Sequence, residues 1–218
     1  MNLPQSILHR YRITYARLEG TRYVGNLDMI RLWERSLRRA ELPIAYSQGF
    51  SPQPRMHFAS TLPVGFLSEM ELTDIWFTSF IELDTLKEKL ESNLPAGIKI
   101  RQIMEISLST PPLQTQVKAA DYQVEIFSTT LEDLQERITS LLEKQSIHRE
   151  RRGKPYDLRP LIFSLKLGDT RQSLEMTLSC QESATGRPEE VLSALDLDPL
   201  AARYTRKTLH LTDPRGKG

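Results

Sequence analysis

The spacing of apolar side chains along the first hundred residues predicts four strands and two helices. Residues 9–18 alternate between hydrophobic and polar side chains, which is the two-residue period of a half-buried strand. Residues 26–41 carry apolar side chains at helical spacing and are followed by Pro43, so we expect a helix there. Its predicted buried face consists of Leu27, Ile30, Trp33, Leu37 and Ala40. Strands at 56–60, 72–80 and 98–106 and a helix at 83–94 complete a β-α-β-β-α-β order.

The same order of elements recurs after a proline-containing segment at 108–117. The predicted strands are 122–127, 158–167, 174–180 and 204–211, and the predicted helices are 131–143 and a short one that begins at Pro188. We therefore expect an α+β protein with two ferredoxin-like units, 1–107 and 118–218, joined by a linker at 108–117. Each unit would be an antiparallel sheet with its helices on one face. The alternative is one larger α+β sheet built from both halves.

Composition narrows the class of protein. Of the 218 residues, 39% are hydrophobic and 26% are charged, which is typical of a globular chain. We expect a cytoplasmic protein without a membrane partner, because the chain shows neither an apolar stretch of about 20 residues nor a secretory leader. Cys180 is the single cysteine, so a disulfide framework and a multi-cysteine metal site are excluded. We expect no metal site and no cofactor bound by this chain.

The charges are segregated along the chain although the net charge is only +1. Residues 1–60 carry nine Lys and Arg against four Asp and Glu, and residues 148–168 carry six against two. Residues 61–147, by contrast, carry seven basic against fourteen acidic residues. Basic blocks that meet in the fold would give a positive surface on a nearly neutral protein.

Four arginines lie along the first predicted helix, opposite its apolar face. Arg31, Arg35 and Arg38 recur at i, i+4 and i+7, and Arg39 follows directly. Guanidinium groups on one rigid face suit phosphate binding, because each offers a planar fork that matches two oxygens. The alternative is an ordinary solvated helix face on which Glu34 pairs with Arg38.

Two loops extend this hypothesis. Residues 46–55 combine aromatic, hydroxyl and amide side chains in a segment stiffened by two prolines, which suits stacking and hydrogen bonding with unpaired RNA bases. The predicted contacts there are Tyr46, Ser47, Gln48, Phe50 and Arg55. The alternative is that the two aromatic side chains belong to the core. A basic loop at 148–159 offers Arg152, Lys154 and Arg159 to phosphates, unless it is merely solvated.

Signatures of catalysis are few. The sequence has no glycine-rich phosphate loop, no Gly-x-Ser-x-Gly elbow and no paired histidines for zinc. Asp28 and His57 are weak candidates for acid–base chemistry on RNA. A lone histidine on a short strand such as His57 is, however, more often a packing residue.

Several blocks of the chain resemble a known bacterial family. These are 23–40 (YVGNLDMIR into ERSLRRA), 42–55 (LPIAYSQGFSPQPR), 62–65 (LPVG), 156–162 (YDLRPLI) and 186–192 (GRPEEVL). They resemble the radical SAM-linked protein family, a domain of unknown function. The resemblance implies a radical SAM protein as partner and a role in RNA modification or ribosome assembly. The family usually has Ser-His where this chain has Gly25-Asn26, and often a histidine where it has Gln53, so a mechanism that needs either imidazole would fail here.

We therefore hypothesise a non-catalytic RNA-binding or substrate-presenting module that acts with a radical SAM protein in tRNA or rRNA modification or ribosome assembly. RNA is the expected nucleic acid, and DNA is not expected. One alternative is a small RNA-processing or RNA-modifying enzyme that uses Asp28 or His57. Another is a pure protein–protein adaptor with Phe50 and Trp33 as interface anchors.

Overall fold

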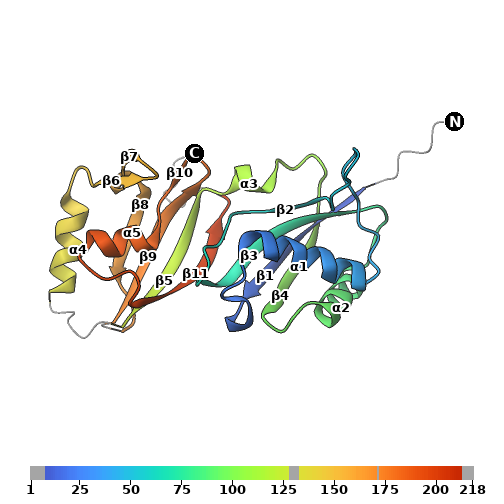
Figure 1. Ribbon diagram of the computed structural model, residues 1–218, viewed down its shortest axis with the longest axis horizontal. Coiled ribbons are helices and arrows are strands. Elements are labelled where there is room, and N and C mark those ends of the chain that lie inside the picture. The colour runs from blue at the N-terminus through green and yellow to red at the C-terminus, as the bar shows by residue number, and fades with distance from the viewer. Residues whose placement is uncertain (1–7, 128–132, 171, 213–218) are drawn as a thin grey trace. The chain divides into compact units, whose positions relative to one another are not determined.

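The structure, a computed structural model, describes residues 8–127, 133–170 and 172–212 (Figure 1). The chain divides into two compact units, Met1–Gln116 (unit 1) and Val117–Gly218 (unit 2). Both contain helices and strands, and the strands within each unit pair antiparallel, so the predicted α+β class is confirmed. Within the described ranges, no helix has the length and apolar character needed to cross a membrane.

Unit 1 follows the predicted order of elements. In chain order it contains β1 (His9–Arg17), a 3-10 turn (Glu19–Thr21), α1 (Asn26–Arg39), β2 (Met56–Phe58), β3 (Leu67–Phe77), α2 (Leu83–Asn93), β4 (Ile98–Ile106) and α3 (Leu113–Gln116). β1 pairs with both β3 and β4, and β2 pairs with β3, which gives the strand order β2-β3-β1-β4.

The core of unit 1 lies between this sheet and two helices. Alternate residues of the central strands, such as Tyr11 and Ile13 on β1, lie on one face of the sheet. There they pack in one core with Met29 and Trp33 of α1 and Leu90 of α2. Figure 1 shows α1 and α2 on one side of these strands. The opposite face of the sheet carries the other set of alternating residues, among them polar and charged side chains.

Unit 2 repeats this plan with an added hairpin. Its elements are β5 (Ala119–Ile126), α4 (Leu134–Glu143), β6 (His148–Arg151), β7 (Lys154–Asp157), a 3-10 turn (Arg159–Leu161), β8 (Ile162–Leu167), β9 (Ser173–Gln181), β10 (Ala184–Thr185), α5 (Pro188–Ala194) and β11 (Ala202–His210). The strand order is β8-β9-β5-β11, and β10 also pairs with β9. β6 and β7 form a separate two-stranded sheet.

The structure corrects several details of the sequence prediction. Leu27, expected in the core, is 69% exposed, whereas Met29 is buried in its place. Residues 148–157, expected to be a loop, form the β6–β7 hairpin, and part of the expected linker forms α3. Leu131, the first residue of the predicted helix 131–143, lies outside the described residues.

Candidate nucleic-acid interface

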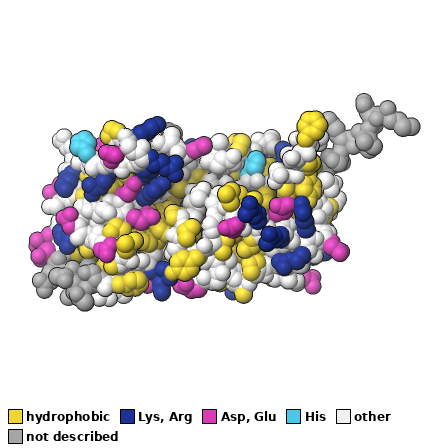
Figure 2. Space-filling model, in the orientation of Figure 1, with side chains coloured by type: hydrophobic (Ala, Val, Ile, Leu, Met, Phe, Trp, Pro, Cys, Tyr) yellow, Lys and Arg dark blue, Asp and Glu magenta, His cyan; other side chains and the backbone are white. Residues whose placement is uncertain are grey.

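Three of the four predicted helix arginines line one groove on unit 1. The groove has a volume of about 400 Å³, and its walls are Val24, Asp28, Arg31, Leu32, Arg35, Arg39 and Pro95. Arg31, Arg35 and Arg39 recur every four residues, so the backbone positions of successive arginines are about 6 Å apart along the helix axis. Figure 2 shows Lys and Arg side chains gathered over α1. The groove therefore presents a row of cations with apolar side chains between them.

The local contacts of these arginines leave donors for a ligand. Arg31 pairs with Asp28 at 3.3 Å, and both side chains are about two-thirds exposed, so water screens this pair. Arg39 donates to the carbonyl of Asn93 at 2.6 Å, which fixes its side chain against the end of α2. Arg35 is exposed and has no ion pair or hydrogen bond among the described residues. Among the described residues that line the groove, the one acidic residue is Asp28, a candidate acid in the sequence.

Arg38 connects α1 to the loop that follows the helix. It pairs with Glu34 at 2.7 Å, one helical turn earlier. The hydrogen bond with Tyr46 and then the negative charge of Glu34 raise the pKa of Arg38. The structure thus brings together a predicted phosphate contact on the helix and a predicted base contact on the loop.

The loop itself is a short hairpin with an exposed aromatic tip. Tyr46 bridges to Pro54, the Ser47 amide donates to the Gln53 carbonyl at 2.8 Å, and the Gln53 amide donates to the Ser47 hydroxyl at 2.9 Å. Gln48 and Phe50 lie beyond these bonds at the tip. The Phe50 ring is fully exposed, so it is not a core residue. Tyr46 is 40% exposed, which leaves part of its ring accessible as well.

At the base of the hairpin, Arg55 and His57 lie against Trp76. The Arg55 guanidinium is 4.9 Å from the centre of the indole ring, and the His57 ring meets the same indole edge-on, also at 4.9 Å. Burial, followed by the nearby charges of Arg10 and Arg55, lowers the pKa of His57, and only Asp74 acts in the opposite direction. His57 is therefore held neutral at neutral pH.

This shift predicts how acid affects stability. The pKa of His57 is lower in the folded protein than its ordinary value of 6.5, so the unfolded chain binds more protons in the window between the two values. Stability therefore rises with pH through that window. We expect the free energy of unfolding in urea to fall more between about pH 7.5 and about pH 5 in the wild type than in His57→Gln. Equal falls in the two proteins would contradict the shift.

Unit 2 exposes two of its three predicted basic residues. Arg152 and Lys154 are exposed on the β6–β7 hairpin. Figure 2 shows Lys and Arg side chains gathered near this hairpin as well. Arg159 is half-buried and donates to the carbonyls of Leu142 at 3.0 Å and Ile162 at 3.3 Å, so its guanidinium serves the fold of unit 2.

The hairpin is fixed to the rest of unit 2 by Arg151. Its guanidinium forms a bidentate ion pair with Glu190, at 3.1 and 2.5 Å, and lies 4.8 Å from the centre of the Tyr156 ring. Burial and the interaction with Glu190 raise the pKa of Tyr156 to about 12. Arg151 is therefore a structural residue, and it fixes the hairpin on which Arg152 and Lys154 are exposed to solvent.

Sequence reasoning missed part of this arrangement, and the structure removes one residue from the adaptor alternative. The groove walls Val24, Leu32 and Pro95 were not foreseen, because their role depends on α1 packing beside the end of α2. Trp33, considered as an interface anchor, is completely buried in the core of unit 1. An adaptor would therefore have to rely on Phe50 without Trp33.

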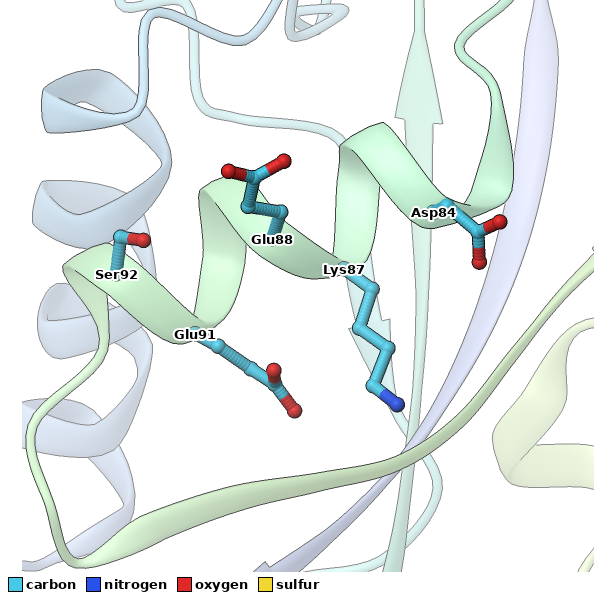
Figure 3. A pocket seen from close by; sticks show the side chains of 5 residues that line it. All are labelled: Asp84, Lys87, Glu88, Glu91 and Ser92. Carbon is cyan, nitrogen blue, oxygen red and sulfur yellow. The ribbon is translucent and has the colours of Figure 1, made fainter.

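A second hollow, on the outer side of α2, is acidic. It is lined by Asp84, Lys87, Glu88, Glu91 and Ser92, and Figure 3 shows its carboxylates pointing in different directions along the helix. Among the described residues, no group of three or more His, Cys, Asp or Glu side chains is placed to hold a metal ion. The α2 hollow therefore lacks the geometry of a cation site.

Comparison with known proteins now identifies the family. Residues 10–188 match the family DUF2344, described as an uncharacterized protein conserved in bacteria. The chain belongs to this family. The DUF2344 region includes the α1 groove, the 46–55 hairpin and the β6–β7 hairpin. No curated protein matches the chain.

Among solved structures, a protein from Galdieria sulphuraria, titled "Crystal Structure of an Unknown Protein", is similar over 94% of this chain and 98% of its own. The two sequences are 12% identical and the TM-score is 0.29. A likeness this weak adds nothing to the assignment of the site.

Proposed function

We propose that this protein is a non-catalytic RNA-binding module that holds single-stranded RNA along α1 of unit 1. The observation that carries the proposal is the groove in which Arg31, Arg35 and Arg39 recur every helical turn. Guanidinium groups in a row bind successive phosphates of a strand, while Val24 and Leu32 between them suit the apolar parts of sugars.

The 46–55 hairpin extends this surface toward bases. Stacking on an exposed aromatic ring contributes about 1–3 kcal/mol per base and accepts any base, because every base has a π-face. Phe50 at the tip and Tyr46 at the base of the hairpin provide such rings. The Ser47–Gln53 hydrogen bonds stiffen the hairpin, which lowers the entropy lost on binding.

Three finer assignments belong to the same proposal. The strand orders β2-β3-β1-β4 and β8-β9-β5-β11, with antiparallel neighbours, support two ferredoxin-like units. The motifs in 23–55 support a radical SAM protein as the partner to which the bound RNA is presented. Arg152 and Lys154 are proposed as a second, separate phosphate contact on unit 2.

The groove is tested by removing its three charges together. We expect Arg31→Gln/Arg35→Gln/Arg39→Gln to bind a fluorescein-labelled oligouridylate about 30-fold more weakly at about 0.2 M salt, because three phosphate contacts are lost. Fluorescence anisotropy measures the affinity. The slope of log affinity against log salt should become shallower by about 2, at about 0.7 per contact for a single strand.

A matched variant controls for net charge. Lys87→Gln/Lys99→Gln/Arg101→Gln removes the same number of charges from exposed positions of unit 1 outside the groove. It should bind the oligouridylate almost as well as the wild type. Equal losses in the two triple variants, or no binding by the wild type at low salt, would reject the proposed function.

A protein–protein adaptor is the second candidate, because an exposed phenylalanine at a stiff hairpin tip also suits a protein pocket. Phe50→Ser distinguishes the two functions. Loss of co-purification with the radical SAM protein after nuclease treatment, with RNA affinity unchanged, would favour the adaptor.

A further inference from the structure

The face of the unit 1 sheet turned away from the helices contains a buried cluster with excess positive charge. Arg10 and Arg12 are neighbours on this face of β1, and both bind Asp74 of β3. Arg10 donates to the carboxylate at 2.6 and 3.1 Å, and Arg12 donates to it at 2.8 and 3.0 Å. The exposed fractions of Arg10, Arg12 and Asp74 are 2%, 9% and 0%.

Two cations thus share one carboxylate in this cluster. Trp76 lies 4.7 Å from the Arg10 guanidinium and 4.9 Å from that of Arg55, which adds a further cation nearby. His57 is opposite Asp74 in the β2–β3 register and packs against the same indole. Buried charge is unfavourable unless it is paired and hydrogen-bonded, so the two guanidiniums also use the dipoles of neutral acceptors.

Those dipoles come from the segment that follows β4, residues Ser107–Gln116, which we term the strap. Arg10 donates to the carbonyls of Thr110 at 2.5 Å and Pro111 at 3.0 Å, and Arg12 reaches the Gln116 side-chain oxygen at 3.5 Å. Neutral oxygens of the strap therefore occupy positions beside two guanidinium groups. An anion at these positions would be bound more strongly than the neutral oxygens are. Arg–phosphate pairs are frequently bidentate, which adds energy and geometric specificity beyond a hydrogen bond to one carbonyl oxygen.

We propose that the strap is an internal occupant of a second RNA-binding site, and that Arg10, Arg12 and Trp76 bind a phosphate and an unpaired base when the strap leaves. This inference deepens the proposed function by naming a covered site for the same class of ligand. A four-stranded sheet that stacks bases on aromatic residues of its open face is a known mode of RNA recognition. Here the indole on β3, which packs against the Arg10 and Arg55 guanidiniums, would provide the ring.

The contacts of the strap make its release feasible. Its backbone hydrogen bonds in unit 1 run within the strap, from Thr110 to Ser107 and from Thr115 to Pro112, rather than to a strand of the sheet. Leu113, with no exposed surface, is the apolar anchor, whereas Leu108 is 52% exposed. Among the described residues, the buried Leu113 side chain and the hydrogen bonds from Arg10 and Arg12 hold the strap in place.

Opening the strap is expected to strengthen RNA binding. Leu113→Gln should bind the fluorescein-labelled oligouridylate at least about tenfold more tightly than the wild type. Leu108→Gln, the same change at an exposed strap position, should bind as the wild type does. In a Trp33→Phe background Trp76 is the one tryptophan left, so quenching of its fluorescence by the oligouridylate reports stacking at this site.

A second variant protects the test from misfolding. Four Gly and Ser residues inserted between Ser109 and Thr110 lengthen the strap while keeping Leu113, and circular dichroism verifies the fold of both variants. Tighter binding with quenched Trp76 in either folded variant supports the inference. Unchanged affinity in both folded variants, or tighter binding without quenching, overturns it.

These experiments distinguish rejection of the covered site from rejection of the α1 groove as an RNA-binding site. If the strap variants gain nothing while Arg31→Gln/Arg35→Gln/Arg39→Gln weakens wild-type binding, the proposed function stands and the covered site is rejected. If the strap variants gain affinity although the groove variant binds as the wild type does, the groove is rejected and the covered site stands.

Discussion

Asp74→Asn should lower the free energy of unfolding by about 3–5 kcal/mol, the cost of leaving buried charges without their partner. The amide keeps the shape of the side chain but removes the negative charge that both Arg10 and Arg12 bind. It also turns an N–H group toward guanidinium donors. Urea unfolding followed by circular dichroism measures the loss, and added salt should not restore it, because buried pairs are screened little.

The partners of Asp74 supply the control. Once the carboxylate is neutral, Arg12 is an unpaired buried cation, so Arg12→Met should cost much less in the Asp74→Asn background than in the wild type. Glu88→Gln, an equal loss of charge on the exposed side of α2, should change stability by less than about 0.5 kcal/mol. Additive effects of the two cluster substitutions would show that the ion pairs do not carry the stability.

This cluster also shows why one face of unit 1 was not foreseen. The alternation along β1 places Arg10 and Arg12 opposite the core residues, which predicts a solvent-exposed polar face. In the structure both arginines are buried, and Arg10 donates to carbonyls of the strap, about a hundred residues later in the chain. A period of two residues reports which side chains share a face, but not what covers that face.

The register of α1 was predicted only in part for a geometric reason. Trp33 and Leu37 were placed correctly in the core, whereas Leu27 was not. Each step of three residues falls about 60° short of a full turn, so two such steps put Leu27 about 120° away from Trp33. Met29, four residues before Trp33, stays close to the buried line.

The sequence predicts the arginines of the groove but not the walls that enclose them. The i, i+4 spacing of Arg31 and Arg35 places them on the exposed side of an amphipathic helix, which the sequence shows directly. Pro95 as the opposite wall depends on how α2 ends beside α1, a contact between residues far apart in the chain. Sequence pattern thus identifies the cations, and tertiary packing determines which of them share a groove.

Trp33→Ala should destabilise the protein by about 3–5 kcal/mol, because it empties the volume of the largest side chain in the core. Trp33 has no exposed surface and meets Tyr15 edge-on at 5.0 Å and Phe58 at 6.5 Å between ring centres. Its indole nitrogen is buried without a hydrogen-bond partner among the described residues. Trp33→Phe removes that unsatisfied donor and keeps an aromatic ring, so it should cost markedly less than Trp33→Ala. Urea unfolding measures both losses.

The same pair of variants distinguishes the structural role of Trp33 from a role in RNA binding. Trp33 lies on the face of α1 opposite Arg31 and Arg35, so the buried indole positions the arginine row without touching a ligand. Trp33→Phe should therefore bind the oligouridylate as the wild type does, whereas the alanine variant should bind more weakly as its helix loosens on the sheet. Equal destabilisation by phenylalanine and alanine would mean that the indole nitrogen has a partner in solution. In that case α1 is held by a polar contact as well as by packing.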